Sequence, residues 1–302
     1  MFRKLPKLIV ILGPTASGKT GLAIKLAKKF NGEIVSADSR QVYKGMNIGT
    51  AKPTKKEMQG IPHYLLDVAS PKRKFTVAQY RKLALEVINK IFKKDKLPIL
   101  CGGTGFYIRA VVDGVTIPGV KPDWALRSDL NKLSTEELFK TLKKLDPQRA
   151  KTIERKNPRR LIRAIEICLK IGKVPSLKFN PLPYPVLMIG IKRPKKELKK
   201  RIKKRFFDWL KRGLILEVMK LRKMGISFKR IEDFGIHYRI IAQYLQNKIG
   251  DKEMIENSIK EIQNYAKRQM TWFQKDKRIH WINPHTKQGF KNIIKICKNF
   301  LN

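Results

Sequence analysis

The sequence predicts an α/β fold in which a parallel sheet is interrupted by an all-helical domain and followed by a helical C-terminal part. Two observations predict it. Short apolar runs alternate with helical patterns over residues 1–114, and helical patterns alone fill residues 115–184. A chain of 302 residues is long enough for this organisation. We therefore expect a core formed by 1–114 and 185–302, with a helical insertion at 115–184.

Four short runs of the core are predicted to form strands, and all but the second are apolar. They are Leu8–Leu12, Glu33–Ser36, Leu97–Cys101 and Val186–Ile191. Apolar residues at helical spacing predict helices over 21–30 and 76–92, between the first three runs. Strands joined by helices pair in parallel, so ligands are expected beyond the carboxyl ends of these strands.

The sequence of the predicted insertion contains signals for the starts of short helices. Ser134-Thr-Glu-Glu137 is a capping box, and Asn157-Pro158 places a capping residue and a first-turn proline before another helix. A proline-rich stretch at 175–185 marks the return to the core. After the run at 186–191, long helical patterns continue to the C-terminus.

The charge of the chain predicts a polyanionic partner. The 68 Lys and Arg residues outnumber the 24 Asp and Glu residues, which gives a formal net charge of +44. Residues 191–230 alone carry 17 basic and three acidic side chains. Nucleic acid is the first expectation for such a surface. The alternative is a general enrichment in lysine on a solvated surface.

Neither a membrane segment nor a disulfide framework is indicated. No apolar run approaches the length of a membrane span, and the three cysteines are widely separated and form no CxxC pair. The histidines 237, 280 and 285 lack metal-ligand spacing. We expect a cytoplasmic protein with no membrane contact, and a monomer, since no protein partner is indicated.

A phosphate-binding motif of the form GxxxxGK[ST] follows the first apolar run. Its residues are Gly13, Pro14, Thr15, Ala16, Ser17, Gly18, Lys19 and Thr20. The backbone N–H groups of such a loop and the helix N-terminus attract anions, lysine adds a charge, and the Thr20 hydroxyl can bind Mg²⁺. Between a strand and a helix, this motif predicts a P-loop NTPase-like core that binds a phosphate chain.

The acidic residue that accompanies this loop is in an unusual position in the sequence. A P-loop ATPase normally carries an aspartate after an apolar strand, but the run 97–101 ends in Gly102-Gly103-Thr104. Asp38 instead follows the second run, and parallel topology brings it and Thr104 to the same rim. A carboxylate there could accept a proton from an attacking nucleophile. The structural alternative is that Asp38 caps a helix or a turn.

Motifs along nearly the whole chain, in this order and spacing, resemble those of the tRNA dimethylallyltransferases, also called tRNA isopentenyltransferases. They are 13–20, Ser36-Ala-Asp-Ser-Arg-Gln-Val-Tyr43, Gly49-Thr-Ala-Lys-Pro53, Pro62-His63, Gly102-Gly-Thr104 and Arg268-Gln-Met-Thr-Trp-Phe273. Gly235-Ile-His-Tyr238 departs from the Gly-Tyr pair expected in that family.

The resemblance implies prenyl transfer to tRNA with Mg²⁺ as cofactor. The P-loop would hold dimethylallyl diphosphate, and N6 of the adenosine on the 3′ side of the anticodon would attack the prenyl group and release pyrophosphate. In this reading Asp38 is the general base and Thr104 assists at the reacting centre.

The resemblance also implies contacts with the anticodon stem-loop, to which the helical insertion would bind. The residues implied are Asp38, Ser39, Arg40, Gln41, Arg127, Arg159, Arg160, Leu161, Ile162 and Arg163. Arg159 and Arg163 are four residues apart near a helix N-terminus, a spacing suited to a phosphate. Arg201 and Arg205 have the same spacing and could reach the pyrophosphate.

Two other functions use the same residues. A small-molecule or nucleotide kinase would employ the P-loop with Asp38 as base toward a hydroxyl. A basic RNA-binding protein would keep the P-loop only as structure. His63, Trp272 and Phe273 are expected to serve packing rather than chemistry.

Overall fold

The computed structural model describes residues 6–116 and 118–302, so residues 1–5 and Ile117 lie outside the described chain. The chain divides into two compact units. Unit 1 comprises Met1–Gly114 and Pro181–Asn302, and unit 2 comprises Val115–Asn180. Among the described residues, no helix combines the length and the apolar composition needed to cross a membrane.

Unit 1 is built on a six-stranded parallel sheet in the order β3-β2-β4-β1-β5-β6. Its strands are β1 Leu8–Leu12, β2 Gly32–Ser36, β3 His63–Tyr64, β4 Leu97–Gly102, β5 Val186–Ile191 and β6 Ile279–Ile282. The four predicted runs become β1, β2, β4 and β5, which confirms the α/β class. Leu12 pairs with both Gly102 and Gly190, so the carboxyl ends of the three central strands lie level.

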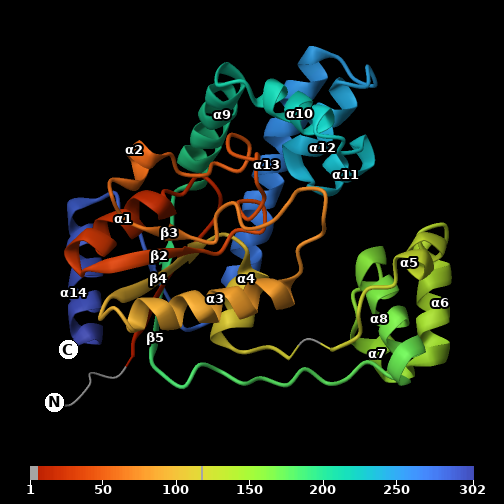
Figure 1. The fold of residues 1–302 in the computed structure, drawn as a ribbon, viewed down its shortest axis with the longest axis horizontal. Coiled ribbons are helices and arrows are strands. Elements are labelled where there is room, and N and C mark those ends of the chain that lie inside the picture. The colour runs from red at the N-terminus through yellow and green to blue at the C-terminus, as the bar shows by residue number, and fades with distance from the viewer. Residues whose placement is uncertain (1–5, 117) are drawn as a thin grey trace. The chain divides into compact units, whose positions relative to one another are not determined.

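Helices cover both faces of this sheet (Figure 1). The helices before the insertion are α1 Lys19–Lys29, α2 Lys55–Met58, α3 Val77–Phe92 and α4 Gly105–Val112. Ile9 and Ile11 pack with α1 and the last helix α14 (Lys287–Leu301), whereas Leu8, Val10 and Leu12 face α3 and α4. Alternate residues of β1 thus enter two different apolar cores, as expected for a central strand.

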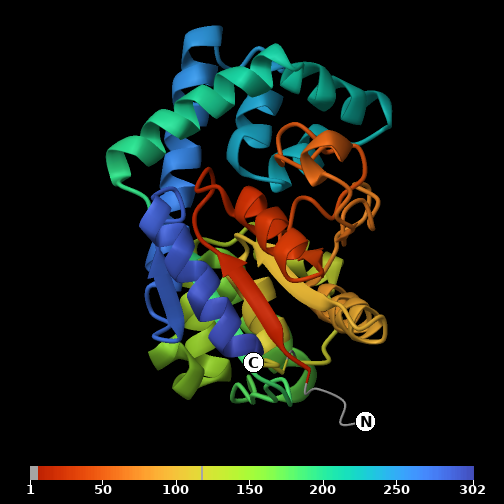
Figure 2. The same ribbon diagram turned by 90° about the vertical axis from the view of Figure 1, so that its left-hand side faces the viewer.

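The remaining helices of unit 1 gather beyond the carboxyl ends of the strands. They are α9 Lys195–Lys211, α10 Leu214–Lys223, α11 Phe228–Asp233, α12 Ile236–Tyr244 and α13 Asp251–Phe273. In Figure 2 the chain leaves β1, turns and enters α1 at the end of the sheet where α9 and α13 lie. These helices therefore wall the region in which a parallel sheet binds its ligands.

In its described residues, unit 2 has helices and no strand, as its sequence predicts. They are α5 Trp124–Leu130, α6 Thr135–Leu145, α7 Pro147–Thr152 and α8 Pro158–Ile171. The side chains of Ser134 and Asn157 cap α6 and α8 by accepting hydrogen bonds from backbone N–H groups. Leu138, Leu142 and Ile165 centre a small core of the unit's own.

Candidate active site

The P-loop joins β1 to α1 with a backbone that needs its glycines. Gly13 and Gly18 have φ of 143° and 100°, in the region that side chains disfavour. A Cβ on Gly13 would also lie 3.1 Å from the Ile191 carbonyl oxygen. α1 begins at Lys19, so the loop leads directly into a helix N-terminus, where exposed N–H groups favour an anion.

Cationic side chains donate hydrogen bonds to the carbonyl oxygens of this loop. Lys19 Nζ donates to the carbonyls of Gly13 and Pro14 at 3.0 and 2.8 Å. Arg201 Nε donates to Ala16 O, and Arg193 Nε donates to Ser17 O, each at 2.9 Å. His285 Nε2 also lies 3.1 Å from Ser17 O. These donors offset the partial negative charge of the carbonyl oxygens. The loop therefore remains attractive to phosphate through its N–H groups.

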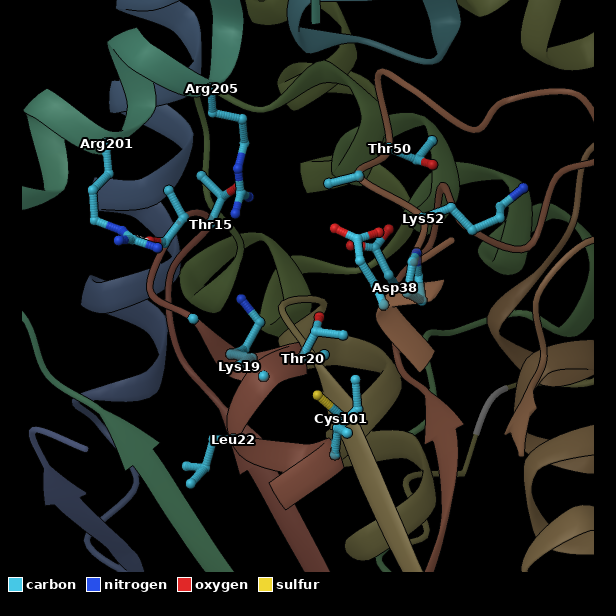
Figure 3. Close-up of a pocket in the computed structure, with 18 of the residues that line it drawn as sticks. Thr15, Lys19, Thr20, Leu22, Asp38, Thr50, Lys52, Cys101, Arg201 and Arg205 are labelled. Atoms are coloured by element: carbon cyan, nitrogen blue, oxygen red, sulfur yellow. Dashed lines mark hydrogen bonds between the residues drawn. The ribbon is translucent and has the colours of Figure 1, made fainter. Parts of the chain in front are cut away.

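A cavity of about 770 Å³ opens above the loop, within the size range of small-molecule sites. Figure 3 shows the Lys19 amino group and the Arg205 guanidinium on one side of this space and the Asp38 carboxylate on the other. Thr20 lies between them (Figure 3). One cavity therefore has both a cationic wall and a carboxylate.

Not every residue of the motif lines the cavity. Thr15, Ala16, Gly18, Lys19 and Thr20 are among the lining residues of the described chain, together with Asp38, Gln41, Arg201 and Arg205. Gly13, Pro14, Ser17, Ser39, Arg40 and Thr104 are not among the described lining residues. The lining from α9 thus brings Arg201 and Arg205 to the P-loop.

Burial perturbs the charges of this cationic wall. It is the main reason why the pKa of Lys19 is lowered to about 8; the nearby Arg205 guanidinium acts in the same direction and the charge of Asp38 in the opposite one. Burial also lowers the pKa of Arg205, as does its neighbour Arg201. Cations gathered on one wall of a cavity are stabilised by a bound polyanion.

Asp38 is held by the turn that follows β2. Its Oδ1 atom accepts hydrogen bonds from the backbone N–H groups of Arg40 at 2.8 Å and Gln41 at 3.3 Å. These bonds fulfil the turn role that the sequence offers as an alternative. They engage only one carboxylate oxygen, and no other hydrogen bond to Asp38 occurs within the described chain. Oδ2 is therefore available to a ligand in the cavity.

Thr104 is joined directly to the Asp38 turn. Its Oγ1 atom accepts from the Ser39 N–H at 2.9 Å, and its own N–H donates to the Ala37 carbonyl at 3.1 Å. Gly102 makes this approach possible, because a Cβ there would overlap the Ala37 carbonyl. The topology brings together the two loops that follow β2 and β4.

The loop 46–53 forms the wall beside Asp38 and depends on residues that the sequence does not single out. Glu217 of α10 accepts the N–H groups of Asn47, Ile48 and Gly49 and the Tyr238 hydroxyl. The side chain of Gln41 donates to the carbonyls of Thr50 and Ala51 at 3.1 and 3.2 Å. An acidic residue in the buried stripe of a basic helix was the only signal for Glu217.

The departure at 235–238 lies against this loop. His237 and Tyr238 are buried over Gly49, where a Cβ would lie 2.6 Å from His237 Nε2. Burial lowers the pKa of His237 to about 3, so the imidazole is neutral at physiological pH. His63 Nδ1 interacts with the Ile61 carbonyl at 2.8 Å and Phe273 is buried, as expected of packing residues, whereas Trp272 is 36% exposed.

Helix α13 contributes two further polar groups to the site. Gln269 contacts the P-loop and the turn before Thr104. Tyr265, one helical turn earlier, interacts with Thr104, and its pKa is raised by burial first and by the charge of Asp38 second. Both residues follow the four-residue spacing of one helix face, which is the signal that could have identified them.

In unit 2 the predicted RNA-contacting residues separate into three groups. Arg127 and Arg163 both pair with Glu166, which is fully buried, with Arg127 Nη2 at 2.6 Å from its Oε2. The side chains of Leu161 and Ile162 lie in the core of the unit, where the inner face of α8 is covered. Arg159 and Arg160 are exposed on the first turn of α8.

Comparison with known proteins agrees with this architecture. The family model described as IPP transferase matches residues 41–276. A tRNA dimethylallyltransferase of Acetivibrio thermocellus is 42% identical over 306 residues, which cover 98% of this chain and 98% of that protein. One of Thermoanaerobacter sp. is 40% identical over 312 residues and covers 98% and 99%.

Solved structures show the same similarity. The tRNA isopentenylpyrophosphate transferase of Bacillus halodurans has a TM-score of 0.74 at 36% identity, over 98% of this chain and 96% of that one. A eukaryotic dimethylallyltransferase acting on tRNA has a TM-score of 0.83 at 26% identity, over 98% and 79%. The chain therefore belongs to the tRNA dimethylallyltransferase family.

Proposed function

We propose that this chain transfers the dimethylallyl group from dimethylallyl diphosphate to N6 of the adenosine on the 3′ side of the anticodon of tRNA, and releases pyrophosphate. The observation that carries the proposal is the single cavity lined by Lys19 of the P-loop and by Asp38. A diphosphate held at one wall and a nucleophile held at the other could react within it.

The donor end of the reaction needs stabilisation of negative charge. The bond from the prenyl C1 to the diphosphate oxygen breaks, and both electrons leave with pyrophosphate. Lys19, Arg201 and Arg205 line the same cavity, and we assign them to the charge that develops on the departing pyrophosphate. Fixed cations in a partly desolvated site stabilise such charge more than water does, because they need no reorganisation.

The residues of the cavity also fit Mg²⁺. Among the described residues no group of three or more His, Cys, Asp and Glu side chains gathers into a protein cage. Mg²⁺ is commonly bound by one or two protein oxygens together with phosphate oxygens and water. The Thr20 hydroxyl, at the start of α1, would supply such an oxygen, and the ion would neutralise charge on the diphosphate.

The acceptor end needs a group that orients an amine and takes its proton. The adenine N6 lone pair is delocalised into the ring, so the amine must be held close and lose a proton as its bond to C1 forms. Oδ2 of Asp38 is the acceptor we assign to that proton. Thr104 and the turn bonds to Oδ1 keep the carboxylate in place.

The same assignment explains the charge of the chain. The target base must leave its stack, which costs a few kcal/mol and is cheapest in a single-stranded loop. Contacts to RNA phosphates would offset this cost. We assign them to Arg40 beside Asp38 and, in unit 2, to Arg159 and Arg160, with 115–180 contacting the anticodon stem.

The deciding experiment uses dimethylallyl diphosphate labelled in the prenyl group, Mg²⁺ and an anticodon stem-loop RNA with an adenosine 3′ to the anticodon. We expect label in N6-dimethylallyladenosine after digestion, without added ATP. Replacing that adenosine with guanosine is the matched control and should abolish labelling. Strict dependence on ATP with phosphate transfer would establish the kinase instead.

A further inference from the structure

Gln269 is a buried side chain that contacts two loops far apart in the sequence. Its Oε1 atom accepts the Thr15 N–H at 2.8 Å, and its Nε2 atom donates to the Gly103 carbonyl at 2.8 Å. Thr15 N–H can only donate and the Gly103 carbonyl can only accept, so the amide has a single orientation that satisfies both. One side chain thus spans the P-loop and the turn after β4.

The space around this amide is closely fitted. A Cβ on Gly103 would overlap Gln269 Nε2, and it would lie 3.6 Å from the Gly13 carbonyl oxygen. The Gln269 side chain is 7% exposed. The glycine therefore allows the glutamine of α13 to reach the backbone of both loops, and little room remains for either loop to shift.

The bridge links the two ends of the proposed reaction. The pairing of β1 with β4 ends at Leu12 and Gly102, just before Gly13 and Gly103. Beyond Gly103, the Thr104 N–H bonds to the turn that carries Asp38. Gln269 thus continues, past the ends of the strands, the connection between the diphosphate wall and the carboxylate.

We propose that Gln269 is a positioning residue for prenyl transfer, which sets the separation between the P-loop and the turns that hold Thr104 and Asp38. This inference rests on the proposed function. Displacing reacting groups by about 1 Å costs about 10²-fold in rate. Losing the bridge should therefore lower kcat by about 10²-fold, and should raise KM for the diphosphate by less than about tenfold, the worth of one neutral hydrogen bond.

Two substitutions test the bridge. Gln269→Leu removes both hydrogen bonds. Gln269→Glu keeps the shape and the acceptor for Thr15, but it can donate to the Gly103 carbonyl only when its carboxyl group is protonated. Its kcat relative to the wild type should therefore rise as the pH is lowered from about 8 to about 5. A residue that only supports folding would not make the ratio of variant kcat to wild-type kcat depend on pH in this way.

Gln274, exposed at the end of α13, provides matched controls. Gln274→Leu and Gln274→Glu should keep the kcat and the pH profile of the wild type. Wild-type kcat in Gln269→Leu, or a pH-independent ratio for Gln269→Glu, would overturn the inference. If Gln269→Leu does not fold, the Gln269→Glu profile decides. Absence of transfer by the wild type would instead refute the proposed function.

Discussion

Asp38→Asn separates the chemical role of Asp38 from its structural one. Oδ1 accepts two backbone N–H groups, so the amide oxygen of asparagine can take its place and the turn can persist. The amide nitrogen then faces the cavity where Oδ2 was. It presents hydrogen-bond donors and cannot accept the proton of N6, so proton transfer is lost while the fold is retained.

The magnitude follows from the two roles. Loss of a positioned general base lowers kcat by about 10² to 10⁴-fold. Affinity for RNA should fall by less than about tenfold, because only one hydrogen bond to the base changes. Asp38→Ala differs, since it also leaves the N–H groups of Arg40 and Gln41 unpaired, at about 1 kcal/mol of unfolding free energy each.

The assay is single-turnover transfer of labelled dimethylallyl groups, with binding of the stem-loop RNA measured separately by fluorescence anisotropy. Asp95→Asn is the matched control, because Asp95 is exposed in the turn before β4. A turnover close to that of the wild type in Asp38→Asn would refute the role of the carboxylate. Equal losses of turnover and RNA affinity would reduce Asp38 to a binding residue.

Three further predictions concern the donor site, the backbone and the RNA. Since the pKa of Lys19 is lowered to about 8, its positive charge is lost as the pH rises through that value. KM for dimethylallyl diphosphate should therefore increase between about pH 7 and pH 9, and Lys19→Arg should flatten this pH profile. A wild-type KM that stays unchanged over this range would contradict the prediction. Gly102→Ala should lower the unfolding free energy by about 1–3 kcal/mol, measured by urea denaturation, because its Cβ meets a backbone carbonyl. Gly21→Ala, in open space on α1, should instead raise it by about 0.5–1 kcal/mol, and equal effects would refute the steric argument. With six to ten phosphate contacts, RNA affinity should fall by about 10³ to 10⁵-fold between 50 and 200 mM salt. Arg159→Ala and Arg160→Ala should each reduce the slope of log affinity against log salt concentration by about one. An affinity that does not change with salt would mean that the charge of the chain serves another purpose.

The main elements of the sheet could be predicted because they carry strong local signals. The buried runs of β1, β4 and β5 are apolar along almost their whole length, and β2 is centred on the apolar pair Ile34-Val35. The glycines of the P-loop mark the end of β1. β3 has two residues and β6 alternates in a short run after a long helix, so neither was foreseen. These edge strands form because the sheet beside them offers unpaired backbone groups.

The site was predictable only in part, for a physical reason. Motifs close in sequence, such as the P-loop and the Asp38 turn, announce their chemistry by residue type. Gln269 and Glu217 act instead through backbone groups more than 160 residues away, and no local pattern encodes such a contact. Leu161 and Ile162 show the converse, since they sit in a resembling stretch whose arginines, but not its apolar residues, reach the surface.

The central claim is that Lys19 and Asp38, which line the same cavity, act in the same reaction. The stoichiometry of a single turnover tests this claim most directly. Pyrophosphate release and formation of N6-dimethylallyladenosine should occur together, in equal amounts and at the same rate, and both should require the RNA. Pyrophosphate release at the full rate without RNA, or modified adenosine formed without it, would contradict the account.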